Sequence, residues 1–174
     1  MGNEMAAYLQ QLETMAFFPG YPIVYAFAAF IRGNKSTTGF RNTIFILTPF
    51  AYAMVGVLYL GLQLKKYYPD YSLARIAQEI QDPFLTIWAF GSLLLWIPAL
   101  NKRPIISLLH SLVFFFVIVK NLFIQLNAPK PDSDVMKNYM RVYSDSMLLN
   151  SGVLISVLII YLTIRLIKKR SAIN

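Results

Sequence analysis

The chain has 174 residues, of which 57% are hydrophobic and 14% are charged, with a formal net charge of +8 and no cysteine. Soluble domains carry about 25% charged residues, so this composition is typical of a membrane protein. The lack of cysteine excludes disulfides, thiolate metal sites and cysteine nucleophiles. One histidine is too few to build a metal site without cysteine, and we expect no metal and no cofactor.

Five apolar runs are long enough to cross a bilayer, which requires roughly 17–25 predominantly apolar residues. In chain order they are Met15–Ile31, Thr43–Leu64, Phe84–Leu100, Pro104–Leu126 and Met147–Ile167. We therefore predict an all-α membrane protein in which residues 1–174 form one polytopic bundle of five transmembrane helices. The first run is short and contains Pro19, Gly20 and Pro22. Four spans with a re-entrant or interfacial segment are therefore the alternative.

The charged residues divide the connections between these runs into two sets. All eight acids fall in the N-terminal tail and the two longer loops. The other connections and the C-terminal tail hold no acid and eight basic residues, namely Arg32, Lys35, Arg41, Lys102, Arg103, Lys168, Lys169 and Arg170. Because dense Lys and Arg in short loops marks the cytoplasmic side, we expect the N-terminus outside and the C-terminus inside a bacterial cytoplasmic (inner) membrane. These charges then border the inner leaflet, and we expect no nucleic-acid partner.

Both longer loops show the periodicity of short amphipathic helices on the outer surface. The first stripe consists of Leu73, Ile76, Ala77 and Ile80. The second consists of Val135, Met136, Tyr139, Val142 and Tyr143, with Asp132, Ser133 or Asp134 as its cap. We expect this second helix to run on into the fifth span. On the opposite side, residues 101–104 predict a tight turn that makes the third and fourth spans an antiparallel hairpin.

A polar stripe follows one face of the fourth span, at the 100° spacing of helical residues. Its polar members are Ser107, His110, Ser111, Asn121 and Gln125, whereas Lys120 points away and is expected to extend to the headgroups. The second span has a matching face with Arg41, Thr48, Tyr52, Gly56, Tyr59 and Gln63. Because unpaired polar groups are costly in hydrocarbon, we predict that the two stripes face each other as a polar seam.

The seam has a structural and a functional interpretation. In the first, His110 forms a hydrogen bond to Tyr52 or Thr48 and helps to hold the helices together. In the second, the seam binds a small amphipathic ligand or moves a proton through His110. No acid lies within a span, which disfavours proton transfer, since pumps and transporters usually employ an intramembrane carboxylate.

Small residues in two of the spans predict close helix packing. Gly56 leaves room in the second span, and Gly152 and Ser156 in the fifth form a small-xxx-small pattern that permits close helix packing.

The sequence contains no phosphate loop, nucleophile elbow or metalloprotease motif, which argues against an enzyme. We predict a small integral membrane protein that acts as an accessory or structural subunit. Its partners would be the lipid bilayer and either a larger membrane complex or further copies of itself. The alternative is a bundle or enzyme that binds a lipid-like molecule at the seam, and a small transporter is the third hypothesis.

Overall fold

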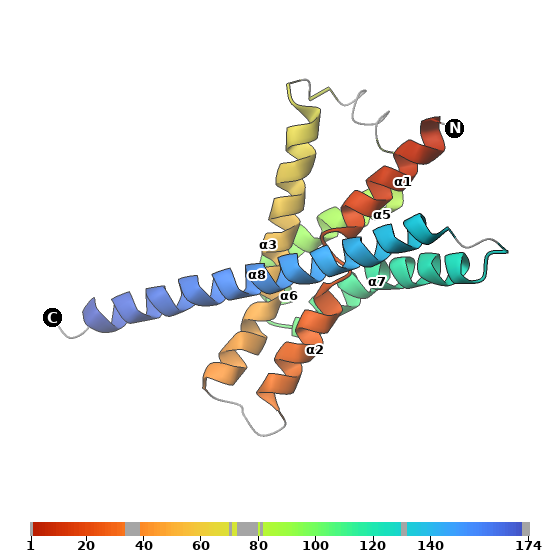
Figure 1. Ribbon diagram of the computed structural model, residues 1–174. Helices are drawn as coiled ribbons and strands as arrows, with labels where there is room; N and C mark the ends of the chain where they lie inside the picture. The colour runs from red at the N-terminus through yellow and green to blue at the C-terminus, as the bar shows by residue number, and fades with distance from the viewer. Residues whose placement is uncertain are drawn as a thin grey trace.

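In the computed structural model, the described residues are 2–33, 39–69, 71–72, 80, 82–129 and 132–171, and every regular element among them is helical. The elements are α1 (Gly2–Met15), α2 (Tyr21–Arg32), α3 (Phe40–Tyr67), α5 (Pro83–Gly91), the 3₁₀ helix η1 (Ser92–Trp96), α6 (Pro98–Asn101), α7 (Pro104–Leu126) and α8 (Ser133–Ser171). Figure 1 shows that α8 runs across α3 rather than alongside it, and that the two ends of the chain lie on opposite sides of the molecule.

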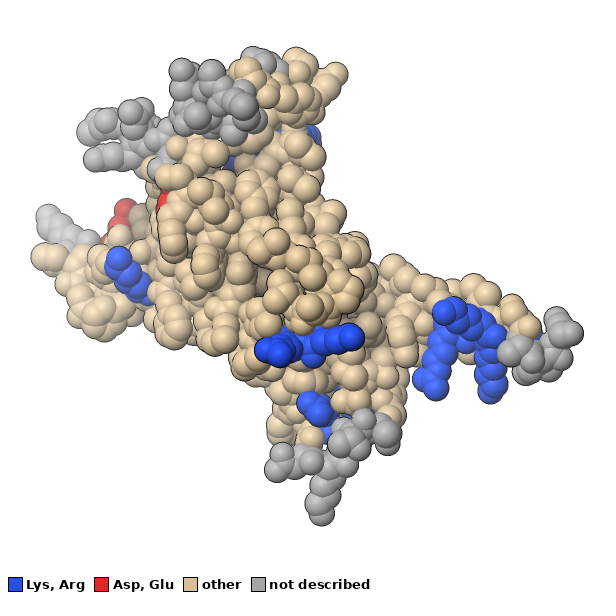
Figure 2. Space-filling model, turned by 180° about the vertical axis from the view of Figure 1, so that it is seen from behind, with Lys and Arg blue, Asp and Glu red and all other residues tan. Residues whose placement is uncertain are grey.

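Three of the described helices, α3, α7 and α8, are long and apolar enough to cross a membrane. They contain the second, fourth and fifth predicted spans, and α7 has the predicted bounds. Their length and composition support a helical membrane protein. Lys and Arg side chains stand in separate groups on a surface made mostly of uncharged residues (Figure 2).

The expected continuation of the second amphipathic stripe into the fifth span is confirmed, because α8 is one helix of 39 residues. Asp132 caps its start: the Oδ1 atom accepts hydrogen bonds from the backbone N–H groups of Asp134 and Val135, at 2.9 and 3.1 Å. The first stripe lies outside the described residues except for Ile80. Lys120 is exposed on α7, as its position outside the polar stripe predicts.

The segment predicted as the first span is not one continuous helix. It is interrupted by a turn between α1, which ends at Met15, and α2, which begins at Tyr21. Pro19 supplies no N–H group and disfavours helical geometry in Phe18, whereas Pro22 lies in the first turn of α2, where a missing N–H costs little. With 12 residues, α2 is about 18 Å long, whereas the hydrocarbon core of a bilayer is about 30 Å thick.

The predicted third span is also interrupted. The α-helix ends at Gly91, η1 continues the chain to Trp96, and α6 adds four residues. Between them Ile97 is extended, with φ −69° and ψ 121°, because the ring of Pro98 disfavours a helical conformation in the residue before it. The predicted tight turn is confirmed, since α6 ends at Asn101 and α7 begins at Pro104.

The turn between α1 and α2 is bonded directly to α8. Asn150 Nδ2 donates to the carbonyl of Phe17 at 2.6 Å, and the N–H of Gly20 donates to Ser146 Oγ at 2.9 Å. Both α8 side chains are buried. Because backbone polar groups away from water need partners, these two bonds allow a non-helical segment to lie inside an apolar protein.

Aromatic rings from this turn and from the start of α2 fill the centre of the molecule. Phe18 stacks on Phe114 of α7, with ring centroids 4.6 Å apart, and contacts Tyr52 and Tyr59 of α3 edge-on at 5.8 and 5.4 Å. The Tyr21 ring lies 4.3 Å from that of Tyr52. A buried side chain of this size removes a large apolar area from water, so the turn contributes to the core as well as interrupting the helix.

We predict that Gly20→Ala destabilises the fold, because a Cβ atom at this position would overlap the backbone of Met147 in α8. The free energy of unfolding should fall by about 1–3 kcal/mol, the usual cost of forcing extra atoms into a packed interior. Denaturant unfolding in one detergent, followed by circular dichroism, measures it. Gly152→Ala is the matched control, since a Cβ there meets nothing within 4 Å. Equal stability of the two variants would contradict the prediction.

Candidate functional site between α3 and α7

The two polar stripes meet where α3 and α7 cross, and the helices diverge beyond that point (Figure 1). At the crossing, the hydroxyl of Tyr52 lies 2.8 Å from Nδ1 of His110. Tyr52, Thr48, Ser107 and Ser111 are fully buried there, and His110 is half-buried. The expected proximity of His110 and Tyr52 is therefore present in the structure.

His110 also joins α7 to α5 through a reciprocal pair of bonds. Its Nε2 atom lies 2.8 Å from the carbonyl oxygen of Trp88, and Trp88 Nε1 donates to the carbonyl of His110 at 3.0 Å. The two rings stack with centroids 5.0 Å apart and an interplanar angle of 6°. Three helices, α3, α5 and α7, are thus joined at one imidazole.

The change from α-helix to 3₁₀ helix after Gly91 makes the carbonyl of Trp88 available. In a continuing α-helix this carbonyl would accept from the N–H of Ser92, four residues later. The N–H of Ser92 donates instead to the carbonyls of Ala89 and Phe90. His110 Nε2 then supplies the donor that the Trp88 carbonyl would otherwise lack.

These bonds determine which nitrogen of His110 carries the proton. A carbonyl oxygen only accepts, so Nε2 must be the donor to Trp88. In a neutral imidazole the other nitrogen is an acceptor, and Nδ1 therefore accepts from the hydroxyl of Tyr52. Both ring nitrogens have partners when His110 is neutral.

The space between the stripes is filled by residues that the sequence analysis did not assign to the seam. The hydroxyl of Tyr21 lies 2.7 Å from Ser107 Oγ, and the ring of Phe18 stacks on Phe114. A first span that forms one straight helix would not bring Phe18 and Tyr21 to this place. The signal was present: Phe17–Pro22 places proline and glycine directly beside aromatic residues, a pattern typical of a turn.

Several seam hydroxyls bond to carbonyls of their own helices. Thr48 Oγ1 donates to the carbonyl of Phe45 at 2.8 Å, and this carbonyl has no helical partner because Pro49 lies four residues later. Ser107 and Ser111 likewise donate to carbonyls three residues earlier, at 2.7 and 2.8 Å. Local backbone bonds therefore account for much of the polarity of the two stripes.

The outer residues of the two stripes have partners on other elements. The hydroxyl of Tyr59 lies 3.3 Å from Thr14 Oγ1 of α1, and Asn121 Nδ2 donates to the hydroxyl of Tyr139 of α8 at 3.2 Å.

The two glutamines at the outer ends of the stripes do not pair with each other. Gln63 is buried on α3, and within the described chain neither atom of its side-chain amide has a hydrogen-bond partner. Gln125 is half-buried near the end of α7. The continuous two-walled seam predicted from the sequence is thus confined to the helix crossing.

The small residues singled out in the sequence have different surroundings. A Cβ at Gly56 would overlap the Ser92 side chain, so Gly56 allows η1 to approach α3 closely. Gly152 and Ser156 are instead exposed on α8, and Ser156 Oγ donates to the carbonyl of Gly152 at 2.9 Å. Their small-xxx-small face makes no close approach to another helix in the described part of the chain.

A groove of about 500 Å³ borders His110 on the α5 side. Its lining is otherwise apolar and includes Trp88, Gly91 and Ile106. Among the described residues, no group of three or more histidines, cysteines or acids lies close enough to hold a metal ion. The crossing is thus a hydrogen-bonded contact of three helices with an apolar groove at its side.

We predict that Tyr52→Phe lowers the free energy of unfolding by about 0.5–2 kcal/mol, because it leaves Nδ1 of His110 without its donor while retaining the aromatic ring. Unfolding in detergent measures the loss. Tyr161→Phe, on the exposed face of α8, is the matched control and should leave stability unchanged. A Tyr52→Phe variant as stable as the parent protein would show that this hydrogen bond is dispensable.

Comparison with protein-family models, curated proteins and solved structures finds no match for this chain. The roles of the seam residues therefore rest on their contacts alone. Those contacts join α3, α5 and α7 with the start of α2, and they place His110 at the centre of the junction.

Proposed function

We propose that the chain is a small integral membrane protein that acts as a non-catalytic structural or accessory subunit of a larger membrane assembly. The observation that carries the proposal is the exposure of α8. Of its most apolar 18 residues only 11% are buried, compared with 50% in α3. Its C-terminal half extends beyond the other helices, so lipid or another protein must cover it (Figure 1).

The hydrogen bonding at the α3–α7 crossing supports a structural role for the seam. Phe18 and Tyr21 occupy the space in which a seam ligand would bind, and the His110 ring nitrogens both have protein partners. A ligand at this place would have to displace buried aromatic rings. The alternative of a lipid-like molecule bound inside the seam is therefore less well supported than an accessory role.

We propose five membrane crossings, of which α3, α7 and α8 are continuous and two are interrupted. The interrupted crossings are α2 with the turn before it, and α5 with η1 and α6. Interrupted helices are tolerated within a membrane where protein groups bond to the free backbone, and Ser146 and Asn150 do so at the first interruption. An odd number of crossings agrees with chain ends on opposite sides of the molecule (Figure 1).

The proposed orientation, with the N-terminus outside and the C-terminus in the cytoplasm, predicts opposite labelling of the two ends. Because the chain has no cysteine, Asn3→Cys and Lys169→Cys each introduce a single thiol. A membrane-impermeant maleimide should label Asn3→Cys in intact cells and Lys169→Cys only after permeabilisation. Labelling of both thiols from the same side would support four spans with a re-entrant segment and contradict five.

Docking through α8 predicts position-specific crosslinking within the native membrane. A photoreactive amino acid at Ile159, 58% exposed on α8, should link the chain to a discrete protein, because helices in lipid associate through closely packed faces. The same group at Phe116, 62% exposed on α7, is the matched control and should link mainly to lipid. Mass spectrometry of the product distinguishes a foreign subunit from a second copy of this chain. Lipid adducts alone at both positions would overturn the proposal.

A further inference from the structure

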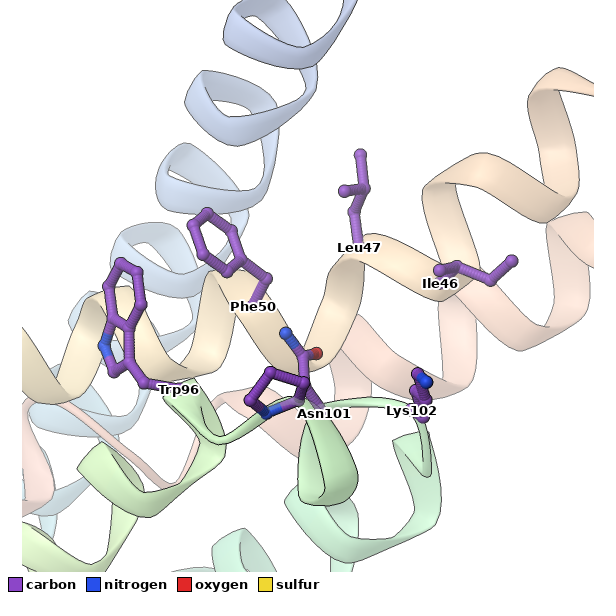
Figure 3. A pocket seen from close by; sticks show the side chains of 7 residues that line it. Ile46, Leu47, Phe50, Trp96, Asn101 and Lys102 are labelled. Atoms are coloured by element: carbon purple, nitrogen blue, oxygen red, sulfur yellow. The ribbon is translucent and has the colours of Figure 1, made fainter.

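A second apolar groove lies between α3 and the η1–α6 segment, and its volume is about 430 Å³ (Figure 3). Its lining residues are Ile46, Leu47, Phe50, Trp96, Pro98, Asn101 and Lys102. The Phe50 and Trp96 rings are in edge-to-face contact, with centroids 4.8 Å apart. Nearly all of this lining is hydrocarbon or aromatic, which suits an apolar chain better than a polar solute.

The groove has an aromatic end and a basic end. Figure 3 shows Trp96 and Phe50 at one end, Ile46 and Lys102 at the other, and the amide of Asn101 between them. The ammonium of Lys102 and the N–H groups of the Asn101 amide are hydrogen-bond donors. A molecule with one acyl chain and one anionic head would match both ends of the groove.

No acid of the described chain forms an ion pair with this basic end. No Asp or Glu occurs in residues 14–69 or 83–131, which include every residue that lines the groove. The ion pairs between described residues join Lys66 with Glu13, Lys137 with Asp134 and Arg141 with Asp145, and none includes Lys102. Lys102 is exposed and is followed directly by Arg103, so an external anion would find two adjacent cations.

The groove beside His110 provides an internal comparison. It has a similar volume of about 500 Å³ and an indole at its edge, that of Trp88. Its lining contains neither lysine nor arginine. The two grooves thus differ in charge more than in size or apolar character.

We propose that the groove between α3 and η1–α6 binds an anionic phospholipid of the bilayer. One acyl chain lies along Leu47, Phe50 and Trp96, and the phosphate binds Lys102 and Asn101. Cationic residues near the membrane surface attract anionic lipid, and the apolar remainder of the groove suits an acyl chain, so each part of the groove meets the matching part of the lipid. The inference rests on the membrane location proposed above and adds a specific lipid site to it.

The two tryptophans of the chain allow the two grooves to be tested separately. Trp88→Phe leaves Trp96 as the only indole, and Trp96→Phe leaves Trp88. Each variant is reconstituted in phosphatidylcholine vesicles that contain an equal fraction of brominated phosphatidylglycerol or brominated phosphatidylcholine. Bromine on the acyl chains quenches indole fluorescence on contact, so quenching reports which lipid lies beside each tryptophan.

We expect Trp96 to show an affinity about fivefold higher for the anionic lipid, which is the effect of one cationic side chain near a membrane surface. Trp88 should show no preference. Lys102→Gln in the Trp88→Phe protein should abolish the preference of the Trp96 groove. Lys120→Gln, an equal change at an exposed position on α7, is the matched control and should retain it.

The possible outcomes separate this inference from the proposed membrane location. Equal quenching of Trp96 by the two lipids, or an anionic preference shared by Trp88, would overturn the lipid site while leaving the membrane location intact. An anionic preference that survives Lys102→Gln would also overturn it. Failure of both lipids to quench either tryptophan would instead overturn the membrane location.

Discussion

The structure depends on partners for backbone groups that its interrupted helices leave free. In an apolar surrounding each such group is costly without a hydrogen bond, so an interruption requires a donor or acceptor from elsewhere in the protein. Asn150 and Ser146 supply them at the turn after α1, His110 at the end of α5, and Thr48 at the proline of α3. The polar residues of the long helices therefore act largely on neighbouring backbone, and they determine where the shorter segments pack.

His110 and Phe18 show how the polar and apolar parts of the core depend on each other. His110 joins α3, α5 and α7 through its two ring nitrogens and its backbone carbonyl. The Phe18 ring fills the adjoining space against Tyr52, Tyr59 and Phe114. The hydrogen bonds determine the orientation of the rings, and the rings exclude water that would compete for the hydrogen bonds. Such a junction favours one arrangement of the helices over others.

The parts of the fold that local pattern determines could be predicted from the sequence. The bounds of α7, the continuation of the second amphipathic stripe into α8, and the turn before Pro104 follow from hydropathy, periodicity and proline position. The irregular first segment entered only as the alternative of a re-entrant or interfacial segment, and the interruption after Gly91 was not predicted, because composition measures how apolar a segment is and not whether its backbone stays helical. The two helical wheels predicted a bond from His110 to Tyr52 or Thr48, and Tyr52 is the partner, whereas Trp88 and Phe18 depend on how the interrupted segments fold back. Asn121 bonds to α8 rather than to the α3 stripe, since α3 and α7 diverge, and a helical wheel contains no information on crossing geometry.

The uninterrupted length of α8 has a mechanical consequence. At 1.5 Å per residue its 39 residues extend about 58 Å, more than the roughly 40–45 Å of a whole bilayer with its headgroups. Ser146 and Asn150, which hold the turn between α1 and α2, lie near the middle of this rod. Because these two side chains bond to the turn, a tilt of α8 and the position of that turn are coupled.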